Sequence, residues 1–259
     1  MDIAGHTFLF MAVAAFAVFF VGVAKAGFGG MIGSLAMPLV ATFSDIATAI
    51  SVLFPTYFVM DVIVAWIYRK SVPWGLMWPM AAAGVVGAIL GAFAFRLIDP
   101  PYLAMFLGAM SMFIGLRFFW QQRFLPDIPN ASQDPSVRRW PRLIGLNGAS
   151  GFTRFFLMGE APIQVFLLPF RLAPQIYVSL LVWFFFVVNA VKVPIVIGMG
   201  IVTLDSIWIS ALLLPVMPFG IFFGKYINSR LPKEPFYVVV HVLLIILGVY
   251  LMANASTQA

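Results

Sequence analysis

Apolar residues run along this chain in long, nearly uninterrupted stretches, and polar residues are confined to the short segments between them. An apolar run of roughly 20 residues predicts a helix that crosses a bilayer. The long runs are 8–24, 46–68, 73–95, 101–119, 174–198, 205–225 and 236–253. Three others, 31–43, 143–153 and 160–170, are too short to cross alone.

The first short run belongs to a glycine-rich stretch, Gly22 to Pro38, with the sequence GVAKAGFGGMIGSLAMP. Glycine destabilises a helix interior by roughly 1 kcal/mol relative to alanine, so Gly27, Gly29, Gly30 and Gly33 together predict that the helix stops here and restarts. Irregular backbone at membrane depth must be buried in protein or line a watery cavity. A glycine-rich face for helix packing is the alternative interpretation.

Composition agrees with a membrane protein, because 63% of the residues are hydrophobic and only 9% are charged. The chain has no cysteine, which excludes disulfides and thiolate metal sites. The net charge of +6 comes mainly from the loops, where it reports membrane orientation and not nucleic-acid binding. No basic residue precedes the first apolar run, so we expect no cleaved signal peptide.

Signatures of enzymes are missing from the sequence. It has no Ser-His-Asp pattern, no HExxH and no phosphate-binding GxxxxGK[ST], which argues against a membrane protease or an ATP-driven pump. We therefore expect a protein that is not an enzyme and that needs no cofactor or metal.

The chain divides into two similar halves, about 8–119 and about 143–253, within a single transmembrane domain. The segment 121–141 is long, polar and proline-bearing, and we interpret it as a linker. Each half begins with a broken apolar hairpin and continues with three long helices, as expected of an internal repeat. The aligned pairs are Ser51 with Ser179 and Asp61 with Asn189 at an offset of 128, and Pro79 with Pro215 and Gly84 with Gly220 at an offset of 136.

Loop charge indicates how the hairpins run. If each hairpin crosses the membrane once, the loop cations divide seven against five. If each hairpin is re-entrant and returns to its own side, eleven cations share one face and Arg96 alone lies on the other. The positive-inside rule favours the second arrangement, which predicts an all-α polytopic membrane protein of two inverted repeats with a cytoplasmic linker and extracytoplasmic termini. The eleven are Arg69, Lys70, Arg117, Arg123, Arg138, Arg139, Arg142, Arg171, Lys225, Arg230 and Lys233.

Five ionisable residues lie inside the apolar segments: Lys25, Asp61, Arg154, Glu160 and Lys192. Each would cost roughly 2.5 to 3.5 kcal/mol or more facing lipid, so we expect them to face a cavity or one another. Three are positive and two are negative, and half-helix N-termini at the hairpin breaks would add partial positive charge. The predicted pocket is net positive and suits a small anion.

The two cations at the breaks each have two interpretations. Lys25 either attracts the anion as a point charge or snorkels from a helix end. Arg154 occupies the comparable break of the second repeat, where its planar fork could hold two oxygens of a sulfonate, sulfate or carboxylate. Alternatively, Arg154 forms a structural ion pair with Glu160, six residues on. Glu160 is also a candidate for proton coupling.

Asn189 and Lys192 are three residues apart and hence share a helical face, from which an amide and an ammonium could reach one ligand. Snorkelling is the alternative for Lys192. Asp61, the repeat mate of Asn189, is a candidate counter-charge or coupling residue. A structural hydrogen bond to a neighbouring backbone is the simpler expectation for this carboxylate.

Four segments together resemble the sulfite exporter TauE/SafE family, and the likeness extends over about 10–252. They are VGVAKAGFGGMIGSLAMPLV, GFTRFFLMGEAPIQVFLLPFRL, FFFVVNAVKVP and LLPVMPFGIFFGKYI. The resemblance implies secondary transport of a small sulfur-containing anion, such as sulfite, an organosulfonate or a sulfoacetate-like compound, in a bacterial inner membrane, by a monomer or homodimer. It carries a substrate-binding role to Lys25, Gly29, Gly30, Asn189 and Lys192.

The second break departs from the family pattern. Family members commonly show a small, Gly-Gly-Pro-rich stretch where this chain has Arg154 to Phe156 and then Gly159 to Pro162. A bulkier, charged break suggests a changed pocket, with Arg154 as a further substrate-binding candidate. Two other functions remain open: a carrier of carboxylates or other organic anions, and a membrane partner protein that does not transport.

Overall fold

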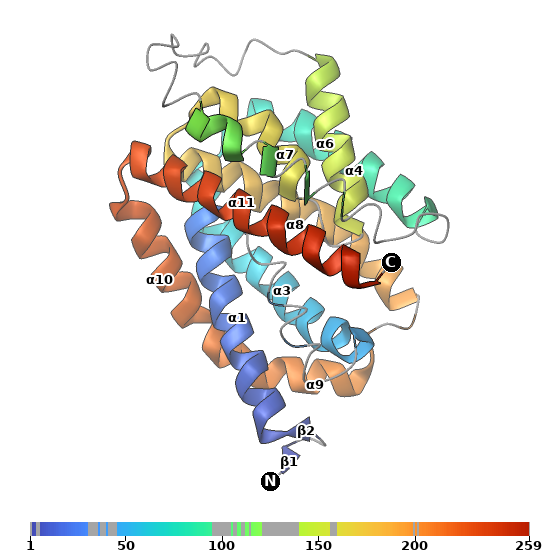
Figure 1. The fold of residues 1–259 in the computed structure, drawn as a ribbon. Coiled ribbons are helices and arrows are strands. Elements are labelled where there is room, and N and C mark those ends of the chain that lie inside the picture. The colour runs from blue at the N-terminus through green and yellow to red at the C-terminus, as the bar shows by residue number, and fades with distance from the viewer. Residues whose placement is uncertain are drawn as a thin grey trace.

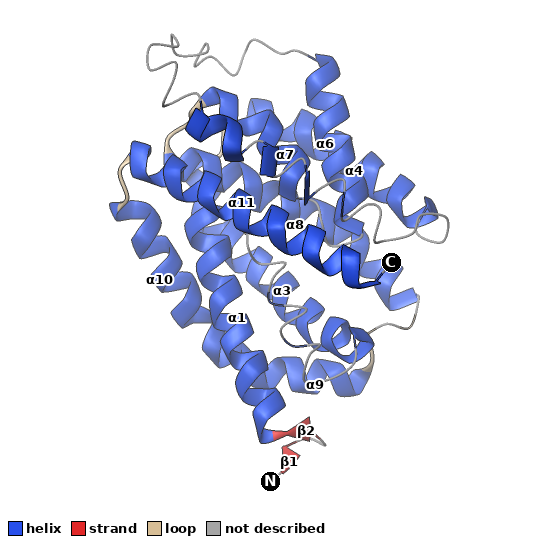
Figure 2. Ribbon diagram, viewed as in Figure 1, coloured by secondary structure: helices blue, strands red, loops and turns tan. Residues whose placement is uncertain are grey.

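The computed structural model describes residues 2–3, 6–30, 46–94, 115–120, 140–155, 160–198, 200 and 202–258, together with positions 36, 40, 105, 108, 109, 112 and 113. These residues form a bundle of helices with a two-strand ribbon, Asp2–Ile3 (β1) with His6–Thr7 (β2), at the N-terminus (Figures 1 and 2). The helices are α1 (Phe8–Phe28), α3 (Ile46–Tyr68), α4 (Trp74–Ala94), α6 (Trp140–Phe155), α7 (Glu160–Leu167), α8 (Pro174–Gly198), α9 (Leu204–Leu213), α10 (Met217–Arg230) and α11 (Lys233–Gln258). Short 3-10 turns follow α3, α7 and α9: η2 (Arg69–Ser71), η3 (Leu168–Phe170) and η4 (Leu214–Val216).

Within the described residues, five helical stretches are long and apolar enough to cross a bilayer, which confirms the predicted polytopic membrane protein. Large apolar side chains face outward on them, as lipid contact requires; Phe93, for example, is 78% exposed. The apolar runs predicted these helices closely, and α3 has the predicted bounds of 46–68. The run 31–43 lies mostly outside the described residues, and of the run 101–119 the structure describes positions 105, 108, 109, 112, 113 and 115–119. The five stretches are Phe8–Phe28, Ser51–Ser71, Trp74–Ala94, Pro174–Gly198 and Ser206–Arg230.

The second predicted hairpin consists of short helices. The helix α6 has 16 residues and α7 has eight, fewer than the roughly 20 that a crossing requires. The predicted linker, 121–141, is two residues too long, because Trp140 and Pro141 already belong to α6. Proline is tolerated in the first turn of a helix, where its missing N–H would have had no intrahelical partner. Residues 121–139 lie outside the described part of the chain.

The glycine-rich stretch ends α1, as the sequence predicts. After Phe28, Gly29 and Gly30 adopt φ values of +71° and +90°, a left-handed conformation that favours glycine. The N–H of Gly29 donates to the carbonyl of Lys25 (3.2 Å), and the N–H of Gly30 donates to that of Ala24 (2.8 Å). The predicted restart of the helix lies in a segment that the structure mostly does not describe.

Gly29 is also closely packed, and this makes Gly29→Ala a test of the break. A β-carbon there would lie 2.4 Å from Cδ1 of Leu181, whereas Gly200, with φ of +70°, has nothing within 4 Å of such an atom. We expect Gly200→Ala to lose only the left-handed strain, about 1–2 kcal/mol. Gly29→Ala should lose roughly 1–3 kcal/mol more from overpacking. Thermal unfolding in detergent measures both, and equal losses would contradict this view of the turn.

Glycines let two pairs of helices approach at backbone distance. In the α4/α6 pair, a β-carbon on Gly87 would lie 1.9 Å from the carbonyl oxygen of Gly148. In the α1/α10 pair, a β-carbon on Gly220 would lie 2.3 Å from the carbonyl oxygen of Phe19. Small residues at a membrane helix interface permit such close backbone packing. We call α1 with α10, and α4 with α6, the glycine-packed pairs.

Each glycine-packed pair takes one helix from each half of the chain. The helices α1 and α6 open the two halves. The helix α4 in the first half corresponds to α10 in the second at the offset of 136, so the two pairs are counterparts. Figure 1 shows α1 alongside α10. Between the pairs, α3 packs against α8, its own counterpart. This is the pattern of contacts that two repeats related by a two-fold axis would make.

Contacts between distant segments gather many of the loop cations at one end of the molecule. The hydroxyl of Ser179 donates to the carbonyl of Ser71 (3.1 Å), which places the start of α8 beside η2. The hydroxyl of Tyr68 lies 3.3 Å from Oδ1 of Asn228, near the end of α10. The hydroxyl of Tyr237, near the start of α11, donates to the carbonyl of Leu172 (2.9 Å). This cationic end therefore holds the chain positions of Arg69, Lys70, Arg171, Arg230 and Lys233.

The helices α1 and α6, which the predicted repeat pairs as counterparts, run in opposite directions relative to the cationic end. The helix α1 runs toward it, because the hydroxyl of Tyr68 donates to the carbonyl of Ala26 (2.6 Å) near the last turn of α1. The helix α4 starts at it, directly after η2. Successive contacts in the α4/α6 pair, Gly87 with Gly148 and Gly91 with Phe152, advance together, so α6 also runs away from this end. In Figure 1, α1 rises from the end that bears the N-terminus, and α6 begins at the opposite end.

Candidate functional site

Lys25, in the last turn of α1, is turned inward and forms an ion pair. Its side chain is buried, and Nζ lies 2.5 Å from Oδ1 of Asp61 on α3. The same ammonium donates to the carbonyl of Tyr57 (2.9 Å) and stands 5.4 Å from the centroid of the Tyr57 ring. A snorkelling lysine would place its ammonium in the interfacial region, so the structure does not support that interpretation.

Asp61 connects two helices through its two carboxylate oxygens. It is 1% exposed; Oδ1 pairs with Lys25, and Oδ2 accepts a hydrogen bond from Nδ2 of Asn189 on α8 (2.7 Å). The expected hydrogen bond to a neighbouring backbone is therefore wrong: both oxygens are used by side chains from other helices. A carboxylate deep in the bundle is costly without such partners.

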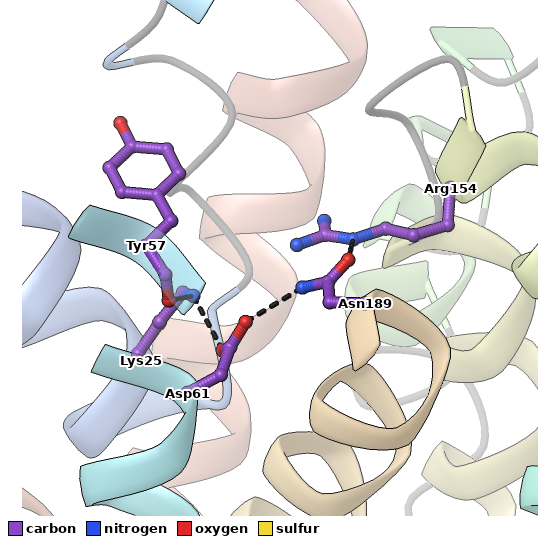
Figure 3. Close-up of polar contacts among 5 residues, drawn as sticks. All are labelled: Lys25, Tyr57, Asp61, Arg154 and Asn189. Atoms are coloured by element: carbon purple, nitrogen blue, oxygen red, sulfur yellow. Dashed lines mark hydrogen bonds and ion pairs between the residues drawn. The ribbon is translucent and has the colours of Figure 1, made fainter. Parts of the chain in front are cut away.

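Asn189 continues the network to the second cation. Its Oδ1 accepts a hydrogen bond from Nε of Arg154, in the last turn of α6, at 3.4 Å. Asp61 and Asn189 are separated by 128 residues, the offset that relates the halves of the sequence. If the halves are symmetry-related repeats, as the sequence predicts, two counterpart residues that touch each other lie close to the axis between them. Figure 3 shows the resulting line of contacts from Lys25 through Asp61 and Asn189 to Arg154.

Both cations sit beside an aromatic ring of their own half, on α3 for Lys25 and on α8 for Arg154. The guanidinium of Arg154 lies 4.6 Å from the centroid of the Phe185 ring, as the ammonium of Lys25 does from Tyr57 at 5.4 Å. Phe185 follows Tyr57 by the same offset as Asn189 follows Asp61. Cation–π attraction favours both arrangements. Each half thus supplies a cation, an aromatic ring and a polar group in the same order.

Lys192 has no cationic counterpart in the first half, where Val64 stands at the equivalent position. Its side chain is 6% exposed, and Nζ lies 3.4 Å from the carbonyl oxygen of Arg154 and 5.5 Å from the centroid of the Phe54 ring. As the spacing predicted, Asn189 and Lys192 lie on one buried face of α8. We call Lys25, Asp61, Asn189, Arg154 and Lys192 the polar cluster.

The two cations stand on the carbonyl side of the breaks. Lys25 and Arg154 both occupy the last turns of their helices, where a cation complements the partial negative charge of the carbonyl end. The helix N-terminus expected at the second break is that of α7, at Glu160, and the one expected at the first break lies outside the described residues. The N–H groups of Gly29 and Gly30 donate to carbonyls of α1. These glycines therefore shape the turn beside Lys25; a β-carbon on Gly30 would lie 3.6 Å from Cγ of Lys25.

Glu160 is the first residue of α7, and its side chain lies outside what the structure describes. The ion pair with Arg154 and the coupling role predicted for Glu160 both remain predictions. The charged side chains of the polar cluster are three cations and one carboxylate, a net charge of +2.

Sequence reasoning missed the aromatic members of this site. Tyr57 and Phe185 stand four residues before Asp61 and Asn189, so that they share a helical face with them, and the offset of 128 would have identified the pair. In Figure 3 the hydroxyl of Tyr57 points away from Lys25 and Asp61. Among the described residues this buried hydroxyl has no hydrogen-bond partner.

Comparisons with known proteins agree with this architecture. The family model described as Sulfite exporter TauE/SafE matches residues 14–251, which include every member of the polar cluster. Comparison with curated proteins and with solved structures gives no match. Because the family model covers nearly the whole chain, the protein belongs to the sulfite exporter TauE/SafE family, a family of membrane transporters.

Proposed function

We propose that this protein is a secondary transporter that carries a small sulfur-containing anion, such as sulfite, an organosulfonate or a sulfoacetate-like compound, across the bacterial inner membrane. One observation carries the proposal: the buried Lys25 and Lys192 and the half-buried Arg154 converge from three helices, and Asp61 is the carboxylate that the described residues place among them. Buried charge of one sign is expensive in a membrane protein and is retained for function. An anion bound at the polar cluster would offset that charge.

Each cation offers a different contact to such an anion. The guanidinium of Arg154 is planar and can donate two parallel hydrogen bonds to two oxygens of a sulfonate or sulfite. Lys192, whose ammonium lies near the backbone of Arg154, can approach the same group as a point charge. Lys25 reaches the site only in competition with Asp61, which holds it at 2.5 Å. We therefore assign the first contact with the anion to Arg154 and Lys192.

The directions of the helices support two inverted repeats with the site between them. Counterpart helices run oppositely, and the touching residues Asp61 and Asn189 stand where the repeats meet. Inverted repeats with broken helices are a recurrent plan of secondary transporters. The positive-inside rule assigns the cationic end to the cytoplasm, which leaves both termini on the extracytoplasmic side.

The glycine-packed pairs bear on how the site would open to either side. Each pair joins helices of opposite repeats at backbone distance, so sliding one whole repeat past the other would disrupt both interfaces. Rocking of one glycine-packed pair relative to the other would leave those interfaces intact. The polar cluster then forms the contact that changes, since Lys25 comes from one pair and Arg154 from the other.

Transport by purified protein in liposomes tests the proposal. We expect Arg154→Ala to reduce uptake of sulfite or a simple sulfonate by about tenfold or more, because losing a hydrogen-bonded charge contact costs 2–5 kcal/mol. Arg142→Ala is the matched control, since Arg142 is an exposed arginine on the same helix. Equal uptake by wild type, Arg154→Ala and Lys25→Ala proteins, all properly folded, would refute the assignment of the site.

A second function, a carrier of carboxylates or other organic anions, rests on the same cations. Competition in the same liposomes separates the two. If a sulfonate and sulfite inhibit uptake more strongly than the carboxylate analogue of that sulfonate, the sulfur-anion assignment stands. If the carboxylate competes best, the alternative replaces it.

A further inference from the structure

We propose that Asp61 is the proton-binding site of this transporter and that one proton accompanies each anion. The inference rests on the proposed function, because it assigns a second substrate to the same polar cluster. Without an anion, ionised Asp61 neutralises Lys25. When Asp61 takes up a proton, Lys25 loses its carboxylate partner and turns to the anion. Release of the anion and the proton on the other side of the membrane restores the ion pair.

The position of Asp61 makes its charge decisive for the cluster. It is 1% exposed and is held between α1 and α8 by Lys25 and Asn189, at 2.5 Å and 2.7 Å. Asn189 in turn contacts Arg154, so the carboxylate is two hydrogen bonds away from the cation that we assign to the anion. An anion and ionised Asp61 would compete for the same positive groups.

Among the described side chains, the groups in contact with Asp61 are Lys25 from α1 and Asn189 from α8. Arg154 from α6 contacts Asn189, and Lys192 from α8 lies at the carbonyl of Arg154. The contact of α3 with α9 lies nearer the start of α3, where the hydroxyl of Ser210 donates to the carbonyl of Val52. Two other acids, Glu160 on α7 and Asp205 on α9, have side chains outside the described part of the structure.

The charge balance gives the sign of the coupling. With Asp61 ionised, the described cluster sums to +2; with Asp61 protonated, it sums to +3 and no longer contains a competing anion. A bound proton therefore strengthens anion binding, and by reciprocity a bound anion strengthens proton binding. A monovalent anion would cross together with its proton as an electrically neutral pair.

The test uses methanesulfonate, because a sulfonate stays ionised over the whole accessible pH range, whereas sulfite itself titrates. Binding to purified wild-type protein is measured by calorimetry from mildly acidic to mildly basic pH. We expect affinity to rise as pH falls, by about tenfold per pH unit where uptake of one proton is fully linked to binding. A pH-sensitive dye in weakly buffered solution should report close to one proton taken up per anion bound.

Two variants identify the acid. Asp61→Asn imitates the protonated carboxyl, so methanesulfonate should bind with an affinity that no longer depends on pH. Glu234→Gln, a change at an exposed acid at the start of α11, should keep the wild-type pH dependence. If a variant fails to fold, the test still rests on wild-type protein. Proton uptake on binding and the pH dependence of affinity, both measured on wild type, then support the inference.

The outcomes separate this inference from the proposed function. If wild type binds methanesulfonate equally well at every pH and takes up no proton, the coupling inference is overturned and the transporter assignment stands. If Asp61→Asn protein still takes up a proton on binding, the proton resides elsewhere and the assignment to Asp61 is overturned. If wild type binds neither methanesulfonate, sulfite nor a carboxylate at any pH, both fail.

Discussion

Replacement of Lys25 by methionine is expected to destabilise the protein strongly, by about 3–5 kcal/mol, because it leaves the buried carboxylate of Asp61 without its ion-pair partner. Methionine matches the length of the lysine stem, so the loss reports the charge and not a cavity. The carboxylate would keep only the hydrogen bond from Asn189, at 2.7 Å. Thermal unfolding in detergent, compared with wild type, measures the effect.

The double change Lys25→Met with Asp61→Asn provides the control. Removing both members of a buried ion pair is often neutral or stabilising, so we expect the double variant to recover most of the stability lost by the single one. Lys70→Met removes an exposed lysine at the cationic end and should have little effect. If Lys25→Met alone is as stable as wild type, the ion pair does not contribute to the fold.

The second large effect concerns the glycine-packed pairs, where Gly151→Ala is expected to separate α4 from α6. A β-carbon on Gly151 would lie 1.9 Å from the carbonyl oxygen of Gly84 and 2.6 Å from its carbonyl carbon, so backbone and not a flexible side chain must give way. Overpacking usually costs 1–3 kcal/mol, and we expect about 3 kcal/mol or more where two backbones must part. Size-exclusion chromatography and thermal unfolding measure the folded fraction and its stability.

Gly145→Ala is the matched control, because Gly145 lies on the same helix and a β-carbon added there would have nothing within 4 Å. Alanine is favoured over glycine in a helix by up to about 1 kcal/mol, so this variant should be as stable as wild type or more so. Similar losses for Gly151→Ala and Gly145→Ala would show that helix propensity and not close packing governs α6.

The helices were largely predictable because, in a membrane, a long apolar run must satisfy its backbone N–H and C=O groups by hydrogen bonds within the run, as a helix does. The end of α1 was predictable because the backbone there needs positive φ, which favours glycine, and Gly29 and Gly30 adopt it. The predicted start of α6, at residue 143, is three residues too late. Pro141 lies in the first turn of this helix, but a proline is equally common in a linker, so the sequence does not distinguish the two.

The pairing within the site was harder to derive from the sequence. The offset of 128 identified Asp61 and Asn189 as counterparts, but nothing in a linear alignment tells that counterparts touch. Nor could spacing choose Asp61, 36 residues away, as the partner of Lys25 in preference to the snorkelling conformation. Such contacts depend on how whole helices pack, for example where Gly29, just after α1, lies against Leu181 of α8.

The exchange of helices between the halves also bears on how the chain is made. The helix α1 is synthesised first, yet its glycine-packed partner, α10, begins only at Met217. Until then the small-residue face of α1 lacks this partner, although Asp61 and Tyr57, which contact Lys25, follow much earlier. Membrane insertion of the first half therefore precedes its packing, and the native bundle can close only when most of the chain has left the ribosome. The two halves therefore complete each other's packing, as the two subunits of a dimer do.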